Sequence, residues 1–210
     1  GGKMLREIED RFRAGGVERV HTLNSSPCFV MPGLDVRYTE AFCLLQAHGY
    51  ELDRYVHNME VELSTSDFDT GEAESVLAGR GITIRRMIRE DEPTLRPWVQ
   101  RNWSQNWATE ACNSLQNDPV TTFVAENDRG IVGFATYDVM VIPGSFGPTG
   151  VEESMRGLGL GKILLLRCLA DMKARGYRRS EIIWVGPVSF YAHTAGARIC
   201  STFMHSTKVL

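Results

Sequence analysis

The chain has 210 residues, of which 43% are hydrophobic, and its formal net charge at pH 7 is −3. This length suffices for one complete hydrophobic core and part of a second, and the near-neutral charge gives no electrostatic reason to expect a nucleic-acid partner. No apolar run approaches the roughly 20 residues of a membrane-spanning helix and no signal-peptide pattern opens the chain, so we expect a cytoplasmic protein without a membrane partner.

The cysteines and histidines lack the spacing of a metal site. The five histidines form no H-E-x-x-H motif, so no metal is expected. The cysteines are odd in number and form no C-x-x-C pair, which favours free thiols in a reducing compartment. They are Cys28, Cys43, Cys112, Cys168 and Cys200.

Residues 1–64 show the pattern of a helix, a strand, a second helix and a last strand, predicted at residues 1–16, 18–23, 39–48 and 59–63. The first 20 residues repeat the pattern of residues 161–180, because Gly1 and Gly16 have the same separation as Gly161 and Gly176. The apolar residues of one helical face also coincide, Leu5, Ile8 and Phe12 with Leu165, Cys168 and Met172. The pattern indicates an internal repeat, and two unrelated amphipathic helices are the alternative.

The segment after this repeat is polar and acidic at residues 65–80, which indicates a linker. Beyond it, residues 82–85 alternate as a strand. The run Glu90-Asp91-Glu92-Pro93 supplies the start signals of a helix, since acidic residues and an early proline favour a helix N-terminus. A second helix is predicted at residues 107–115, and strands at 121–125 and 131–137 are joined by a turn.

Three alternating glycines stand in the run Arg156-Gly157-Leu158-Gly159-Leu160-Gly161-Lys162, directly before an apolar helix at residues 162–175. Glycines let backbone N–H groups approach a ligand closely, and a helix start adds unpaired N–H donors with a partial positive charge. A Walker A loop is excluded because Arg156 and Ile163 stand where it needs a glycine and a hydroxyl. A dinucleotide fingerprint is excluded because Lys162 and Leu164 stand where it needs its last glycine. The run therefore predicts a phosphate or pyrophosphate site of another kind.

The spacing that remains is Arg-x-x-Gly-x-Gly, formed by Arg156, Gly159 and Gly161. It resembles the acetyl-CoA signature of the GNAT superfamily, the GCN5-related N-acetyltransferases. The resemblance covers about 130 residues, from Gly81 to Leu210. It includes a strand at 181–185, the pair Phe190-Tyr191 before Gly196, and a closing strand at 203–209.

The resemblance implies an α/β (α+β) fold with a mixed, mostly antiparallel central sheet flanked by helices. It implies acetyl-CoA as the co-substrate, with no metal. The backbone at Val151 is expected to pair with the pantetheine arm, and the loop is expected to hold the pyrophosphate. The loop residues carried over are Arg156, Gly157, Leu158, Gly159, Leu160, Gly161 and Lys162.

The internal repeat then predicts a tandem arrangement. Residues 1–64 resemble the C-terminal half of a degenerate GNAT-like domain, residues 65–80 are the linker, and residues 81–210 form a complete GNAT domain. The pair Gly49-Tyr50 resembles the closing Gly-Phe of the family, and Gly1 corresponds to the last loop glycine, so we expect a longer protein. Half a domain exposes a sheet edge and an apolar face. Its cover is expected from the second domain, a homodimer partner or a separate N-terminal fragment.

Acetyl transfer to an amine needs a polarised carbonyl, a base for the amine and a proton donor for the thiolate. Tyr191 is the candidate acid by its match to the family's Tyr-x-x-x-Gly pattern, although Gly196 follows five residues later rather than four. A phenol has an ordinary pKa near ~10 and is protonated at neutral pH. Glu152 and Glu153 follow Val151, and at most one of them faces the site because adjacent strand residues point oppositely. Glu152 is the candidate base, and an exposed surface charge is the alternative for each glutamate. Asp138 is a further option for the base.

The family places its acceptor pocket between the first helices and the sheet. Trp103, Trp107 and Asp138 are the candidates to line it here, with packing in the core as the alternative for the tryptophans. Trp184 stands where many relatives carry a CoA-contacting asparagine, so contacts near that strand are expected to differ, and Trp184 with Gly186-Pro187 is the candidate to shape the gap where pantetheine inserts. We expect an N-acetyltransferase that acts on the amine of a small-molecule acceptor. The alternative is a non-catalytic module that binds or senses acyl-CoA.

Overall fold

The computed structural model describes residues 1–22 and 31–210, so Leu23 of the first predicted strand and Cys28 lie outside the described residues. Nine strands of this described part form one sheet in the order β1-β9-β3-β8-β7-β6-β5-β4, with β2 paired to β9. All pairs are antiparallel except β7 with β8. The predicted fold class, a mostly antiparallel mixed sheet flanked by helices, is confirmed.

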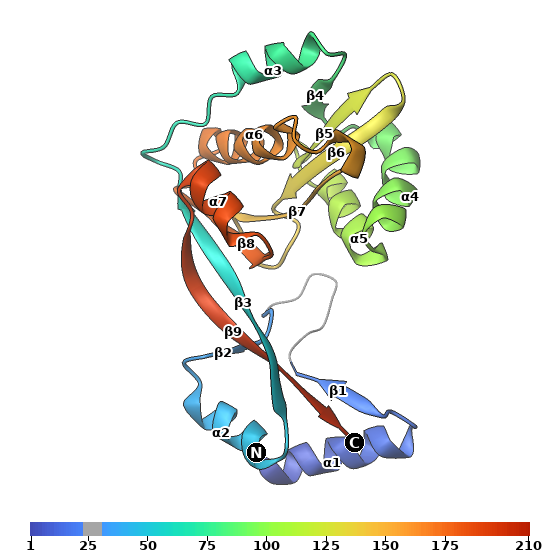
Figure 1. Cartoon of the computed structure of the whole chain (residues 1–210), viewed down its shortest axis with the longest axis vertical. Helices are drawn as coiled ribbons and strands as arrows, with labels where there is room; N and C mark the ends of the chain where they lie inside the picture. The colour runs from blue at the N-terminus through green and yellow to red at the C-terminus, as the bar shows by residue number, and fades with distance from the viewer. Residues whose placement is uncertain (23–30) are drawn as a thin grey trace.

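The chain forms two lobes joined by the long pair of β3 and β9 (Figure 1). The smaller lobe contains α1 (Gly2–Ala14), β1 (Arg19–His21), β2 (Leu34–Asp35), α2 (Thr39–Ala47) and the first part of β3 (Glu51–Glu62). The larger lobe begins with α3 (Gly71–Ala78), β4 (Thr83–Arg86), α4 (Glu92–Asn102), α5 (Gln105–Asn113), β5 (Thr122–Asn127), β6 (Gly130–Tyr137) and β7 (Ser145–Val151). It continues with α6 (Leu160–Ala174), β8 (Arg179–Val185), α7 (Val188–Ala195) and the first part of β9 (Arg198–Val209), whose second part extends into the smaller lobe. Short 3-10 turns at Arg89–Asp91, Ser114–Gln116 and Glu153–Met155 complete the described elements.

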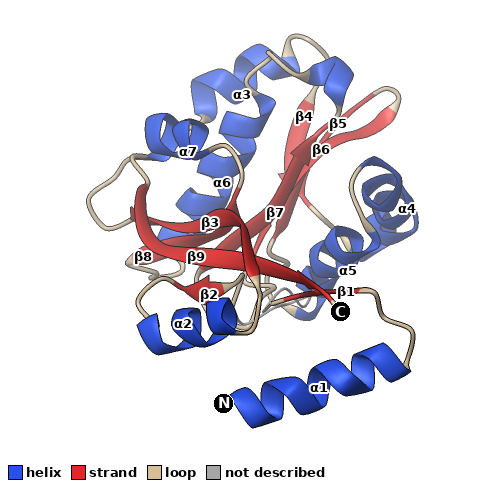
Figure 2. Ribbon diagram, turned by 60° about the horizontal axis from the view of Figure 1, so that its bottom comes forward, coloured by secondary structure: helices blue, strands red, loops and turns tan. Residues whose placement is uncertain are grey.

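Two hydrophobic cores lie on opposite faces of the central strands, with α6 on one face and α4 and α5 on the other (Figure 2). Successive side chains of a strand point to opposite faces, so Ala135 of β6 belongs to the α6 core while Phe134 belongs to the α4–α5 core. This two-sided burial explains why β6 is almost wholly apolar. The same packing places α5 and α6 on opposite faces of the sheet at β7.

The strand predicted at 59–63 is longer than its pattern indicates, and it lies inside the sheet of residues 81–210. β3 runs from Glu51 to Glu62 and separates β8 from β9. Its apolar alternation is confined to the end that packs on the larger lobe, where Val61 is fully buried. The exposed first half gives no burial pattern from which the strand could be read.

The pairing of β3 with β9 is symmetric about Val56 and Phe203, which face each other. On one side Leu52 pairs with Ser206, and on the other Met59 pairs with Ile199. The same relation continues outward, because β1 pairs with the end of β9 as β8 pairs with the end of β3. In the sheet, β1 and β3 thus occupy places equivalent to β8 and β9. The division into two GNAT-like units stays a prediction.

Residues 65–80, which the polar composition predicts as a linker, contain the helix α3. Phe68 and Leu77 are buried in the α6 core, and the hydroxyl of Thr70 donates to Glu74 at 2.5 Å. Asp67, Asp69 and Glu72 are exposed and Glu74 is half-buried, so the acidic composition alone does not show that the segment packs. Four cysteines are free thiols within the described ranges, namely Cys43, Cys112, Cys168 and Cys200.

Candidate active site

The central strands β7 and β8 part in the middle of the sheet. They pair in parallel at Ser145 with Glu181 and at Phe146 with Ile182. Beyond this point β7 stays with β6, reaching Val151, whereas β8 stays with β3. The edge of β7 from residue 147 to 151 therefore faces a gap rather than a neighbouring strand of the described sheet.

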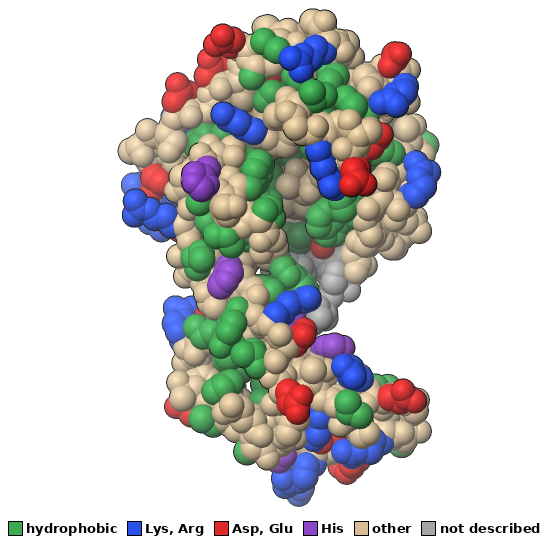
Figure 3. Space-filling view, viewed as in Figure 1, with side chains coloured by type: hydrophobic (Ala, Val, Ile, Leu, Met, Phe, Trp, Pro, Cys, Tyr) green, Lys and Arg blue, Asp and Glu red, His purple; other side chains and the backbone are tan. Residues whose placement is uncertain are grey.

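A cavity of about 770 Å³ occupies this gap, and residues of α5, β7, β8 and α7 line it. Hydrophobic side chains surround the hollow on the face shown in Figure 3. Of the residues predicted from the sequence, the cavity brings together Trp107, Val151, Arg156, Gly161 and Tyr191. The cavity is thus lined by three of the expected cofactor-binding residues and by Tyr191, one of the two expected catalytic residues.

The glycine loop leads into α6 at one end of this cavity. Gly157 and Gly159 have φ of +83° and +81°, a left-handed conformation that favours glycine. α6 begins at Leu160 without a side-chain cap, so the first-turn N–H groups, including those of Gly161 and Lys162, have no partner within the helix. They present donors and a positive dipole end, which suits a phosphate.

The side chains of this loop divide between the core and the solvent. Leu160 is buried in the α6 core and Leu158 packs against that core, so only the backbone groups of these two residues are available to a ligand of the loop. Arg156 lies 3.6 Å from Glu153, but both side chains are largely exposed, and such a pair is weak. Arg156 lines the cavity and Lys162 is exposed, so both cations are accessible to an anionic ligand.

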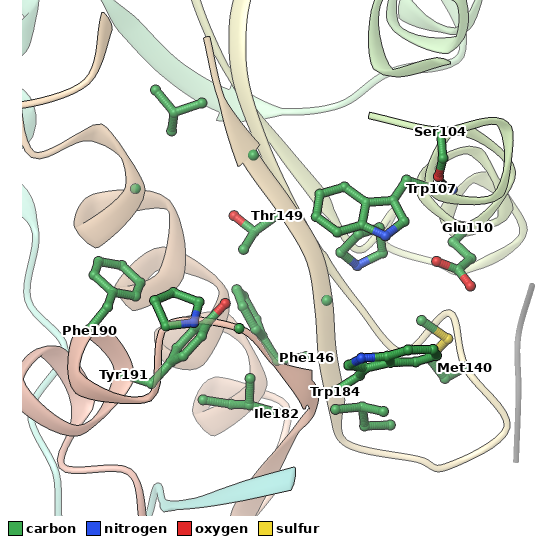
Figure 4. A pocket seen from close by; sticks show the side chains of 18 of the residues that line it. Ser104, Trp107, Glu110, Met140, Phe146, Thr149, Ile182, Trp184, Phe190 and Tyr191 are labelled. Carbon is green, nitrogen blue, oxygen red and sulfur yellow. Dashed lines mark hydrogen bonds between the residues drawn. The ribbon is translucent and has the colours of Figure 1, made fainter. Parts of the chain in front are cut away.

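Tyr191 projects from α7 to the cavity and is 7% exposed. Its ring lies edge-on to Phe190 at 5.0 Å and to Phe146 at 6.2 Å between centroids. Burial raises the pKa of Tyr191 to about 12. The phenol is therefore protonated at neutral pH, as a proton donor requires. Figure 4 shows it on the same side of the cavity as Phe190.

Glu152 does not join Tyr191 at this cavity. It lines a separate cavity of about 370 Å³ together with Trp98, Arg101 and Asn102. Its backbone N–H donates to Val132 at 2.9 Å, so it continues the strand after Val151, and adjacent residues of a strand point to opposite faces. Ser154 donates to its carboxylate at 2.5 Å. The geometry thus separates the candidate base from the candidate acid.

Trp103 and Asp138 also lie outside the cavity lining. Trp103 stacks behind Trp107 with 6.0 Å between ring centroids and packs edge-on against Phe134, so it supports the wall. Asp138 has φ of +53°, and its carboxylate accepts hydrogen bonds from the Gly144 N–H and the Tyr177 hydroxyl, both at 2.6 Å. Aspartate tolerates this conformation and bonds its own turn, so its role here is structural.

Glu110 and Met140 are among the lining residues that the sequence did not predict, and Trp184, a candidate to shape the gap, also lines the cavity. Glu110 is 2% exposed and follows Trp107 by one helical turn, a spacing that places both on one face. That spacing was the available signal for Glu110. Trp184 has φ of +51°, and its backbone N–H donates to Asn58 of β3 at 3.0 Å. Nothing in the local sequence indicates this long-range contact.

The sequence matches the family model of the acetyltransferase (GNAT) family over residues 84–194, while a search among curated proteins found no match. The structure is similar to a GCN5-related glucosamine N-acetyltransferase region of a fungal multi-domain GH3 β-N-acetylglucosaminidase, with a TM-score of 0.76 and 17% identity over 94% of this chain and 26% of that one. It is similar to a GCN5-related N-acetyltransferase from Sphaerobacter thermophilus, with a TM-score of 0.71 and 22% identity over 96% of this chain and 64% of that one. A tandem GNAT protein from the clavulanic acid biosynthesis pathway gives 0.59 and 15% over 95% and 66%. At these identities the likeness concerns the fold, and this chain spans less than two thirds of the length of the first two proteins.

Proposed function

This chain belongs to the GNAT family of acetyltransferases, and we propose that it transfers an acetyl group from acetyl-CoA to the amine of a small-molecule acceptor. The observation that carries the proposal is one cavity that joins the glycine loop of α6 to the buried phenol of Tyr191. A pyrophosphate site and a hydrogen-bond donor for the leaving sulfur on one cavity suit acyl transfer from a CoA thioester.

The donor is held mainly by backbone groups. The first-turn N–H groups of α6 take the pyrophosphate, with Arg156 and Lys162 as nearby cations. The gap edge of β7, ending at Val151, offers backbone groups to the pantetheine amides. A Cβ at Gly161 would lie 3.8 Å from both Val151 and Phe190, so the glycine keeps this passage open.

The chemistry is an addition followed by an elimination. The neutral amine nitrogen attacks the thioester carbon and forms a tetrahedral intermediate, the nitrogen then loses one proton to solvent, and the C–S bond breaks to release the thiolate of CoA. An ordinary thiol has a pKa of about 8.5, which is below the value of about 12 for Tyr191. Tyr191 therefore stabilises the leaving sulfur by donating a hydrogen bond, and the proton that neutralises the thiolate comes ultimately from solvent.

The test is the release of free CoA thiol from acetyl-CoA with a panel of primary amines. Tyr191→Phe is expected to lower kcat about 100-fold or more, with a change of less than about threefold in the Kd for CoA. Tyr177→Phe is the matched control, because its hydroxyl bonds Asp138 outside the cavity lining. Unchanged turnover in Tyr191→Phe would contradict the role of Tyr191. CoA binding without turnover of any amine would favour a non-catalytic acyl-CoA-binding module.

A further inference from the structure

The second cavity, of about 370 Å³, lies beside the last turn of α4, where this helix packs along β6 (Figure 1). Three elements bring charged side chains to it: Arg101 ends α4, Arg129 stands in the β5–β6 turn and Glu152 follows β7. Neither Tyr191 nor any described residue of the glycine loop lines it. It is therefore distinct from the cavity at the gap of β7, and its volume is near the lower end of the range for small-molecule sites.

The two arginines of this cavity keep their charges available to a ligand. Within the described ranges, neither guanidinium forms an ion pair with a carboxylate. The Nη2 of Arg129 donates to the Met155 sulfur at 3.8 Å, and a thioether is a weak acceptor. Arg101 and Arg129 are both exposed, so each retains several N–H donors for an anionic ligand.

Glu152 brings the opposite charge to the same cavity. It is half-buried, and its carboxylate accepts a hydrogen bond from the Ser154 hydroxyl at 2.5 Å, whereas a carboxylate has about four acceptor positions. A carboxylate that reaches solvent and shares a cavity with arginines is ionised at neutral pH. Because no ion pair joins it to either arginine, Glu152 can accept hydrogen bonds from an ammonium group of the ligand.

An apolar surface lies between these charged groups. Trp98 is 8% exposed, and its ring packs edge-on against Trp103 at 5.2 Å and against Phe134 at 6.1 Å between centroids. The Asn102 Nδ2 donates to the Trp98 carbonyl at 2.9 Å, which ties the last turn of α4 together. The indole is thus held in place, and it suits the methylene groups of a short ligand.

From this set of charges we propose that the second cavity binds a small amino dicarboxylate, an acidic amino acid of the size of glutamate. Arg101 and Arg129 come from different elements and can each bind one carboxylate, since guanidinium and carboxylate geometries match. Glu152 binds the ammonium group, and the methylene groups lie on Trp98. Two positive side chains and one negative side chain complement a ligand with two negative groups and one positive group. The proposal does not depend on the proposed acetyl transfer, because the donor cavity is a different one.

The first test is calorimetric titration of the wild-type protein with L-glutamate, L-glutamine, glutarate and inorganic phosphate. Glutamine lacks the second carboxylate, glutarate lacks the ammonium group, and phosphate offers nothing to Glu152. Loss of one charged hydrogen-bond partner weakens binding about 10-fold or more, so the Kd for glutamate is expected to be lower by at least that factor than the Kd for each of the others. Saturating CoA is expected to leave it unchanged. No binding of glutamate, equal binding of any other compound, or displacement of glutamate by CoA overturns the proposal.

The second test uses Arg129→Gln and Glu152→Gln. The matched controls are Arg89→Gln and Glu90→Gln, which change two exposed residues of the 3-10 turn before α4. Arg129→Gln is expected to weaken glutamate binding about 10-fold. Glu152→Gln is expected to weaken glutamate binding but to strengthen glutarate binding, because it removes a like-charge repulsion. Unchanged glutamate binding in either variant, or equal weakening of glutamate and glutarate in Glu152→Gln, overturns the assignment. Thermal melting of all four variants checks that the fold is kept.

Discussion

Replacement of Asp171 by asparagine is expected to loosen α6, the helix that carries the glycine loop. Asp171 lies near the C-terminal end of α6, and its two carboxylate oxygens accept hydrogen bonds from Arg86 of β4 at 2.9 and 2.6 Å. The Tyr137 hydroxyl of β6 donates to it at 2.5 Å, and Arg175 in turn donates to that hydroxyl at 2.9 Å. One carboxylate thus ties the helix to two strands.

The expected loss is about 3 kcal/mol in the free energy of unfolding. Hydrogen bonds to charged groups contribute about 1.5–3 kcal/mol each, and Asp171→Asn removes the charge and puts an N–H group opposite the Arg86 donors. The sum is discounted for solvent screening, since the Arg86 side chain is 30% exposed and that of Asp171 is 17% exposed. For a chain of this size the loss corresponds to a fall in Tm of roughly 6–12 °C.

The effect is expected to depend on pH. Burial alone would raise the pKa of Asp171, but hydrogen bonds from Arg86 and Tyr137 lower it below its ordinary value of 3.8. A lowered folded-state pKa gives stability that is present above the unfolded pKa and is lost as pH falls through the folded pKa. The difference between wild type and Asp171→Asn is therefore full at pH 7 and shrinks as pH falls below about 4.

The assay is urea denaturation and thermal melting of wild type, Asp171→Asn and the control Asp128→Asn. Asp128 is exposed in the turn between β5 and β6, so its replacement is expected to change stability by less than about 0.5 kcal/mol. Equal stability of the two variants at pH 7, or a difference that stays constant down to pH 3, would refute the reasoning.

Four glycine substitutions test the cavity wall and the glycine loop. Gly150→Ala would put a Cβ 2.4 Å from the Trp103 ring, so we expect the free energy of unfolding in urea to fall by about 1–3 kcal/mol. Gly186→Ala is the control and is expected to keep its stability, because its Cβ would meet nothing within 4 Å. Equal losses in the two variants would contradict this packing. Gly159→Ala must hold a left-handed residue at φ +81°, so it is expected to lose about 1–2 kcal/mol and to bind CoA more weakly in calorimetry. Gly161→Ala has no such conformation to hold, and its Cβ would make ordinary contacts at 3.8 Å, so weaker CoA binding with unchanged Tm is expected; a matching fall in Tm would contradict the backbone argument for Gly159.

Local signals in the sequence were sufficient for most elements of the larger lobe and for the loop. The helix start at Leu160 follows two glycines with positive φ, and such a turn is encoded by neighbouring residues alone. Strands β5 and β6 are read from apolar runs bounded by a turn. The family resemblance then supplied Tyr191, which lies on the cavity with Val151.

Properties that depend on contacts between distant residues could not be predicted in this way. The place of β3 between β8 and β9 depends on pairing with residues more than 100 positions away, and half of that strand is exposed and carries no burial pattern. The same long-range contact, from Asn58 to Trp184, sets an indole on the cavity wall.

The sequence by itself determined the family, most elements of the larger lobe and the glycine turn before α6, because each depends on residues that are close in the chain. Only the tertiary structure decided which acidic residue faces the cavity. Glu152 lies beyond the end of β7 and turns to the other face, while Glu110 comes from a helix packed across the sheet. The direction of a side chain depends on strand phase and helix rotation, which the packing of the whole sheet fixes.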